Sequence, residues 1–97
     1  MKEVSPLIAD EVLNSKTAMA VLRTLIQRDM PLPVSRIAKE IRSNYVTVRK
    51  HVKLLEEADL ITSVQYGKRR LYKTKTTNER ITVLKSFIKA WYNPKAS

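Results

Sequence analysis

The feature that most constrains the fold is the tight turn Arg42-Ser43-Asn44, which separates two helical patterns. Residues 35–41 place Ile and Ala side chains on one side of a two-turn helix. Residues 45–58 repeat an apolar arc at the same spacing over a longer helix. Serine and asparagine both tolerate turn geometry, and both cap a following helix. The sequence therefore predicts a helix, a short turn and a second helix.

A β-hairpin is predicted directly after the second helix. Asp59 lies where the chain leaves that helix, in an expected left-handed conformation for which glycine is the commoner residue. Residues 61–66 and 71–74 are rich in Ile, Val, Thr and Tyr, which favours two antiparallel strands. Gly67, the one glycine of the chain, falls at the tip, where a positive φ is needed. The whole pattern predicts a winged helix-turn-helix, with the hairpin as the wing.

A further core helix precedes this motif. Asn14 or Ser15 can cap it, and apolar residues then recur on one broad face as far as about residue 29. The segment Met30-Pro31-Leu32-Pro33 cannot continue the helix, because proline lacks an amide hydrogen and disfavours helix before it. We expect an extended connector in which Val34 adds a short strand, followed by Ser35 as the next N-cap.

The last predicted helix runs to about Tyr92, between the capping box Thr76-Thr77-Asn78-Glu79 and the terminator Asn93-Pro94. Its apolar stripe either covers its own domain or forms a dimer seam. We expect the seam, because three helices and a wing already make a complete small unit. The stripe comprises Ile81, Leu84, Phe87, Ile88, Trp91 and Tyr92, of which Leu84, Phe87, Ile88 and Trp91 are the predicted dimer interface.

The expected fold class is mainly α with a small β-hairpin (α+β): a three-helix core, a wing and a C-terminal dimerisation helix. The 97 residues are enough for one small domain. We divide the chain into an N-terminal arm at 1–14, the winged helix-turn-helix at 15–75 and the dimerisation helix at 76–97. The arm contains Ser5-Pro6, a helix start signal, and is expected to pack on a partner subunit.

The charge of the chain predicts a polyanionic partner. The formal net charge is +10, from 19 basic and 9 acidic residues, which makes nucleic acid the default ligand. In the second motif helix the basic residues precede the acidic pair Glu56-Glu57, the reverse of the order that the helix dipole favours. The adjacent cations Lys68-Arg69-Arg70 at the wing repel one another unless a polyanion accepts them. Both features indicate an anion-binding surface.

The sequence offers no chemistry for an enzyme, a metal or a cofactor. It has no cysteine, and His51 is its one histidine, for which we expect packing or a backbone hydrogen bond. One glycine cannot build a phosphate-binding loop. No apolar run approaches the roughly 18 residues of a membrane helix. We expect a cytoplasmic, nucleoid-associated protein without an evident small-molecule ligand.

Residues 43–61 (SNYVTVRKHVKLLEEADLI) and 66–72 (YGKRRLY) resemble the winged-helix regulators of prokaryotes. The ArsR-like group is closest, and the MarR and PadR groups are also similar, over about residues 15–74. Asp59 departs from the usual glycine, and the lack of cysteine and clustered histidine argues against a metal-responsive ArsR-like protein.

The resemblance implies that the second motif helix enters the DNA major groove and that the wing meets the adjacent minor groove or backbone. The implied recognition-helix residues are Asn44, Tyr45, Val46, Thr47, Arg49, Lys50 and Lys53. The implied wing contacts are Lys68, Arg69 and Arg70, and the implied backbone contacts are Ser35 and Arg36.

Two functions remain open on the sequence. The first is a homodimer that binds double-stranded DNA sequence-specifically and regulates transcription, as a repressor without a sensor domain. The second is a structural DNA-binding protein, either of chromatin or of plasmid or chromosome partition, that spreads along DNA. A winged helix used only to bind protein fits the cationic wing less well.

Overall fold

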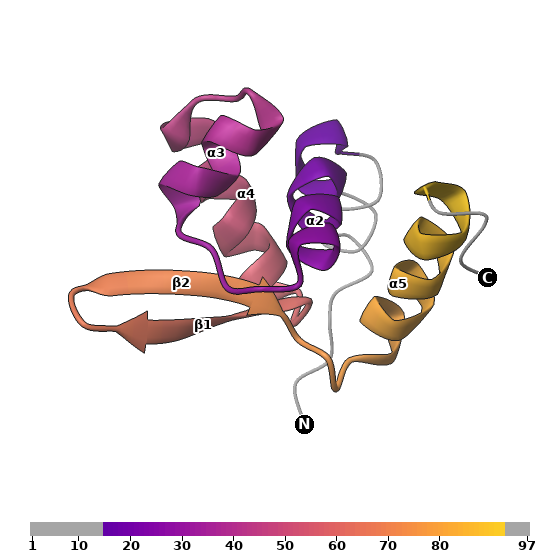
Figure 1. Cartoon of the computed structure of the whole chain (residues 1–97). Coiled ribbons are helices and arrows are strands. Elements are labelled where there is room, and N and C mark those ends of the chain that lie inside the picture. Colours follow the sequence, from indigo (N-terminus) through magenta and orange to yellow (C-terminus); the bar gives the residue numbers. More distant parts are fainter. Residues whose placement is uncertain (1–14, 93–97) are drawn as a thin grey trace.

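The computed structural model describes residues 15–92. They form α2 (Lys16–Arg28), α3 (Val34–Ile41), α4 (Tyr45–Glu57), β1 (Ile61–Tyr66), β2 (Arg69–Thr74) and α5 (Glu79–Tyr92). The hairpin extends to one side of α2, α3 and α4, and α5 stands on the other side of α2 (Figure 1). This arrangement confirms the predicted winged helix-turn-helix. The predicted arm at 1–14 and the terminator at Asn93-Pro94 lie outside the described residues.

Capping side chains set the boundaries of α2 and α4 as predicted. Ser15 Oγ accepts the Ala18 N–H at 3.1 Å and starts α2. Arg42 has a φ of 57° and ends α3, after which Asn44 Oδ1 accepts the Thr47 N–H at 2.7 Å and starts α4. Each cap satisfies an amide that the helix itself leaves without a partner. The turn between α3 and α4 is therefore specified by its own residues.

The start of α3 differs from the expectation. The short strand pairing falls on Leu32, whose N–H and carbonyl both bond to Tyr72, at 2.9 and 2.8 Å. This pairing holds Pro33 extended, and the Pro33 carbonyl accepts the first helical amides. Val34 is therefore the first residue of α3 and packs in the core, so its assignment to a strand was wrong. Ser35 lies inside the helix and is not its N-cap.

The core draws on all four described helices and on the hairpin. In α4, the side chains of Val48, Val52 and Leu55 are fully buried, as their spacing predicts. The same cluster contains Val21, Leu22 and Leu25 of α2, Ile37 of α3, Ile61 of β1, Tyr72 of β2 and Ile81 of α5. Each fully buried aliphatic side chain stabilises the fold by about 1.5–3 kcal/mol. None of these four helices is long and apolar enough to cross a membrane.

Tyr45 does not belong to this core, although its spacing placed it on the inward arc. Its side chain is 52% exposed. It lies in the first turn of α4 and faces a surface groove shared with the start of α3 and the wing. The buried arc of α4 therefore begins one turn later, at Val48.

The wing is a regular two-residue hairpin. Tyr66 pairs with Arg69, which leaves Gly67 and Lys68 as the turn. Gly67 has a φ of +64°, as predicted, and a turn with glycine first matches the twist of the two strands. Pairing therefore continues to the turn, and β2 begins at Arg69 instead of Leu71. Arg69 and Arg70 are strand residues, not tip residues.

The last helix begins at Glu79, two residues later than a capping box at Thr76 implies, and has a different cap. Asn78 Oδ1 accepts the Arg80 N–H at 2.8 Å, so Asn78 is the cap and the box that began at Thr76 was wrong. Ile81 and Ile88 are buried within the single chain, and Leu84 is half-buried. Val83, Phe87 and Trp91 form a separate row that is exposed.

Candidate nucleic-acid interface

A groove with a volume of about 450 Å³ lies between the start of α3, the outer side of α4 and strand β2. We call it the α4–wing groove. It is lined by Pro33, Val34, Ser35, Tyr45, Arg49, Lys53, Glu56, Arg69, Arg70 and Tyr72. Four of these side chains are cationic and one is a carboxylate, so the groove attracts anions. The fold thus brings together sequence-predicted residues from three separate elements.

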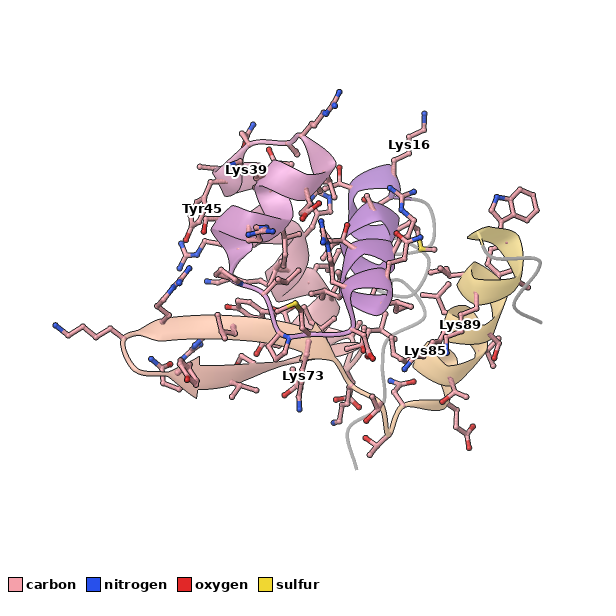
Figure 2. All side chains as sticks on the ribbon, viewed as in Figure 1. Lys16, Lys39, Tyr45, Lys73, Lys85 and Lys89 are labelled. Carbon is pink, nitrogen blue, oxygen red and sulfur yellow. The ribbon has the colours of Figure 1, made fainter. Side chains whose placement is uncertain are left out.

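Helix α4 presents its predicted contact residues outward. Val46 is 73% exposed, and Arg49, Lys50 and Lys53 are also exposed, while Thr47 is half-buried. Figure 2 shows Tyr45 on the side of the molecule toward which the hairpin extends. The exposed basic residues follow the helical spacing that separates them from the buried arc at Val48 and Val52. An α-helix with such a face fits the major groove of B-DNA.

Asn44 differs from the other predicted contacts because its side chain already has a structural task. Its Oδ1 accepts the Thr47 N–H at 2.7 Å and caps α4. The two-bond pairing of asparagine with adenine needs both the oxygen and the amide nitrogen. The cap occupies one lone pair of Oδ1 and orients the side chain, while Nδ2 remains available to donate to a ligand.

The wing carries its three predicted cations on an exposed ribbon. Lys68 lies in the turn, and Arg69 and Arg70 follow as the first residues of β2. All three side chains are exposed. Successive strand residues alternate between the two faces of the ribbon, and both Arg69 and Arg70 line the α4–wing groove. A thin cationic hairpin of this kind suits the narrow, strongly negative minor groove.

The two predicted backbone contacts at the start of α3 have different surroundings. Ser35 is exposed and lines the α4–wing groove. Arg36 Nε donates to Glu40 Oε1 at 3.3 Å, and the same carboxylate oxygen forms an ion pair with Arg28 of α2. The hydrogen bond from Arg28 is the main cause that lowers the pKa of Glu40 below its ordinary value. Glu40 therefore competes with phosphate for Arg36.

His51 has the backbone role expected for it. Its Nδ1 lies 2.8 Å from the Thr47 carbonyl oxygen, one turn earlier in α4. Because a carbonyl oxygen only accepts, Nδ1 is the donor. The ring thus packs along its own helix. Within residues 15–92, no three His, Cys, Asp or Glu side chains converge as metal ligands.

The groove and the wing also contain residues that the sequence interpretation missed. Glu56 lines the groove and is the one carboxylate there. Its position seven residues after Arg49 and three after Lys53 places it on their face, so helical spacing could have revealed it. Tyr66 is 73% exposed on the wing, directly opposite Arg69 in the strand register. The alternation of strand residues between two faces would have revealed the exposure of Tyr66 only with the strand register in hand.

Comparisons with known proteins agree with this geometry. A family model described as a helix-turn-helix domain matches residues 13–64. We found no curated protein sequence that matches the chain significantly. The structure is similar to that of reduced HlyU from Vibrio cholerae, at a TM-score of 0.73 and 11% identity, over 90% of this chain and 87% of that one.

Two further solved structures show the same fold. One is the homodimeric winged helix-turn-helix DNA-binding domain of a possible ArsR-family transcriptional regulator from Mycobacterium bovis. It has a TM-score of 0.70 and 18% identity, over 93% of this chain and 80% of that one. The other is NolR from Sinorhizobium fredii, with a TM-score of 0.70 and 14% identity, over 95% of this chain and 97% of that one. The expected likeness to MarR and PadR proteins is not tested by these structures.

Proposed function

The chain belongs to the helix-turn-helix domain family, and from this premise we propose that it is a homodimeric, sequence-specific regulator of transcription that binds double-stranded DNA. The observation that carries the proposal is the α4–wing groove, in which cations from α4 and β2 face one concave surface. The net charge of +10 supports the same ligand. We further propose that it represses by occupying a promoter, in the cytoplasm on the nucleoid.

On this proposal α4 reads the major groove. Arg49, Lys50 and Lys53 are exposed on it and can donate to guanine edges or to phosphates. Val46, at 73% exposure, offers an apolar surface for a thymine methyl group. Tyr45 and Thr47 extend the same contact surface toward the start of the helix. Base readout is thus assigned to α4.

The wing and α3 position the duplex. Arg69 and Arg70 flank the groove, and Lys68 extends the cationic surface to the turn. Ser35 and Arg36 lie at the start of α3, where a phosphate meets both a side chain and the positive end of the helix dipole. Contacts to phosphate hold the register on DNA without carrying sequence information themselves.

The dimer is proposed to form through α5. The exposed rings of Phe87 and Trp91 stack on each other, with centroids 5.9 Å apart and an angle of 23° between the planes. Val83 extends the row by one turn. The Mycobacterium bovis domain with the same fold is homodimeric. Two copies related by a two-fold axis would read two half-sites about one helical turn apart.

A footprint on long DNA tests the proposal as a whole. A dimeric regulator is expected to protect a discrete site whose two halves are related by symmetry. Protection that extends along the duplex as the protein concentration rises would instead identify the spreading, partition-type protein. No protection at any site, in low salt, would contradict DNA binding altogether.

Arg49→Ala and Arg69→Ala are expected to have different effects on DNA binding. Loss of a guanine contact at Arg49 should weaken binding to the selected site by about 1–3 kcal/mol and relax its sequence preference. Loss of a wing contact at Arg69 should weaken binding to specific and unrelated duplexes alike. Titration of each variant against both duplexes measures the difference. Equal losses from both variants on both duplexes would contradict base readout by α4.

Glu40→Gln is expected to strengthen DNA binding. The substitution removes the carboxylate that holds Arg36 and frees this guanidinium for phosphate. If Arg36 then gains one phosphate contact, the slope of log affinity against log salt should become steeper by about one. Glu79→Gln is the matched control, because it removes one exposed carboxylate on α5, outside the α4–wing groove. An unchanged slope for Glu40→Gln would show that Arg36 does not reach the backbone.

A further inference from the structure

One side chain connects the end of the recognition helix to the start of α5. Asn78 Nδ2 donates to the Asp59 carbonyl at 2.7 Å, and Asp59 is the left-handed residue through which the chain leaves α4. Asn78 Oδ1 accepts the Arg80 N–H at 2.8 Å and caps α5. The side-chain amide thus binds the end of α4 through its nitrogen and the start of α5 through its oxygen. Because the amide group is planar, it fixes the angle between these two hydrogen bonds.

Lys75 reinforces this connection. Its Nζ lies 2.5 Å from Asp59 Oδ1, and its N–H donates to the Leu60 carbonyl at 3.0 Å. The Asn78 N–H in turn donates to the Lys75 carbonyl at 2.9 Å. The segment after β2 is therefore held against Asp59 and Leu60, at the end of α4, by three hydrogen bonds, those of Asn78 Nδ2, Lys75 Nζ and the Lys75 N–H. We call Asp59, Lys75 and Asn78 the α4–α5 joint.

The joint gives a reason for aspartate at position 59. A φ of 65° strains any residue with a β-carbon, and glycine would adopt it at lower cost. Glycine would keep the carbonyl that receives Asn78 but would lose the carboxylate that holds Lys75. Aspartate accepts the strain and supplies both acceptors.

Two further contacts hold the first half of α5 on the rest of the domain. Ile81, one turn into α5, is 1% exposed in the common core, and Lys85 Nζ lies 4.0 Å from Asp29 Oδ1 at the end of α2. With its first half fixed in this way, α5 directs Val83, Phe87 and Trp91 away from the core. The angle between α5 and α4 is then set within one subunit.

We propose that Asn78 is a positioning residue for DNA-site selection: by holding the start of α5 on the end of α4, it sets the half-site spacing that the dimer accepts. This inference rests on the proposed dimeric DNA binding through α5. In such a dimer, the angle between α5 and α4 determines the separation and rotation of the two recognition helices. One added base pair moves a half-site by about 3.4 Å and turns it by about 35°, so a rigid joint discriminates strongly between spacings.

The test compares half-site spacings on one family of duplexes. The intact protein first selects its highest-affinity duplex from random DNA, and one or two base pairs are then inserted into or deleted from the centre of that duplex. Asn78→Asp keeps an oxygen for the α5 cap but cannot donate to the Asp59 carbonyl. Asn78→Ser is the second variant, with a cap but a shorter side chain. Thr76→Asp is the matched control, because it adds the same charge as Asn78→Asp at an exposed residue of the same segment, outside the α4–α5 joint.

The unchanged protein and Thr76→Asp are expected to lose about tenfold or more in affinity when the spacing changes by one base pair. Asn78→Asp and Asn78→Ser are expected to lose less than about threefold, while the thermal unfolding midpoint stays close to that of the unchanged protein. A merely structural role would lower affinity equally at every spacing. An identical spacing profile in the unchanged protein and in both Asn78 variants would overturn the positioning role alone. A selected duplex without paired half-sites would overturn the dimeric DNA-binding proposal and this inference with it.

Discussion

DNA affinity is expected to fall about 10³–10⁵-fold when the salt concentration rises from 50 to 200 mM. The physical reason is counterion release: each phosphate that a cation neutralises frees a condensed ion, and this gain disappears as bulk salt rises. Two subunits would place Arg49, Lys50, Lys53 and the wing cations on the duplex, enough for on the order of 6–10 phosphate contacts. Fluorescence anisotropy of a labelled duplex across this salt range measures the slope.

Single-residue variants separate the electrostatic part of that affinity from base readout. Lys53→Gln should reduce the salt slope by about one for each half-site contact that is lost. Val46→Ala is the uncharged control on the same face of α4, and it should leave the slope unchanged while discrimination between sequences weakens. An affinity for DNA that hardly changes with salt would contradict the α4–wing groove as a phosphate-binding surface.

Local sequence signals were sufficient for most of the fold. The turn Arg42-Ser43-Asn44, the cap at Ser15 and the positive φ at Gly67 were all predicted, because each depends on residues within a few positions. The start of α3 was not predicted, because it depends on the pairing of Leu32 with Tyr72, which lies 40 positions further along the chain. Local propensity contains no information about such a contact.

The candidate site was predictable residue by residue but not as an assembled surface. Helical spacing identified the exposed basic face of α4, and composition identified the cationic wing. That Arg49 and Arg70 line one groove with Tyr45 follows from the docking of the hairpin beside α4, which is a tertiary property. The restraint of Arg36 by Glu40 follows the i,i+4 spacing of one helix and could have been predicted, whereas the ion pair between Glu40 and Arg28 of another helix could not.

Fewer residues are available for the predicted dimer seam than the sequence pattern indicated. Four residues were predicted for it, but Ile88 is only 4% exposed within the single chain and Leu84 is half-buried. An interface cannot use side chains that already pack inside the subunit. The seam therefore remains a prediction that now depends on the exposed row of Val83, Phe87 and Trp91.

Replacing Phe87 and Trp91 together by alanine is expected to raise the dissociation constant of the dimer by about 10³-fold or more. Buried aromatic residues at the centre of an interface each contribute about 2 kcal/mol or more, and every 1.4 kcal/mol corresponds to a tenfold change. Because the two side chains are 58% and 69% exposed in one subunit, the fold should persist. Sedimentation velocity over a range of concentrations measures the association, and thermal unfolding checks the fold.

The loss of the dimer should carry over to DNA. A monomer presents one α4 to one half-site, so the Phe87 and Trp91 variant should bind weakly and lose its preference for paired half-sites. Lys89→Ala serves as the control, because Lys89 is exposed on α5 but lies about 200° around the helix from Phe87. It should sediment and bind like the unchanged protein. If the unchanged protein itself sediments as a monomer at micromolar concentration, α5 is not the seam, and the stacked rings of Phe87 and Trp91 must serve another contact.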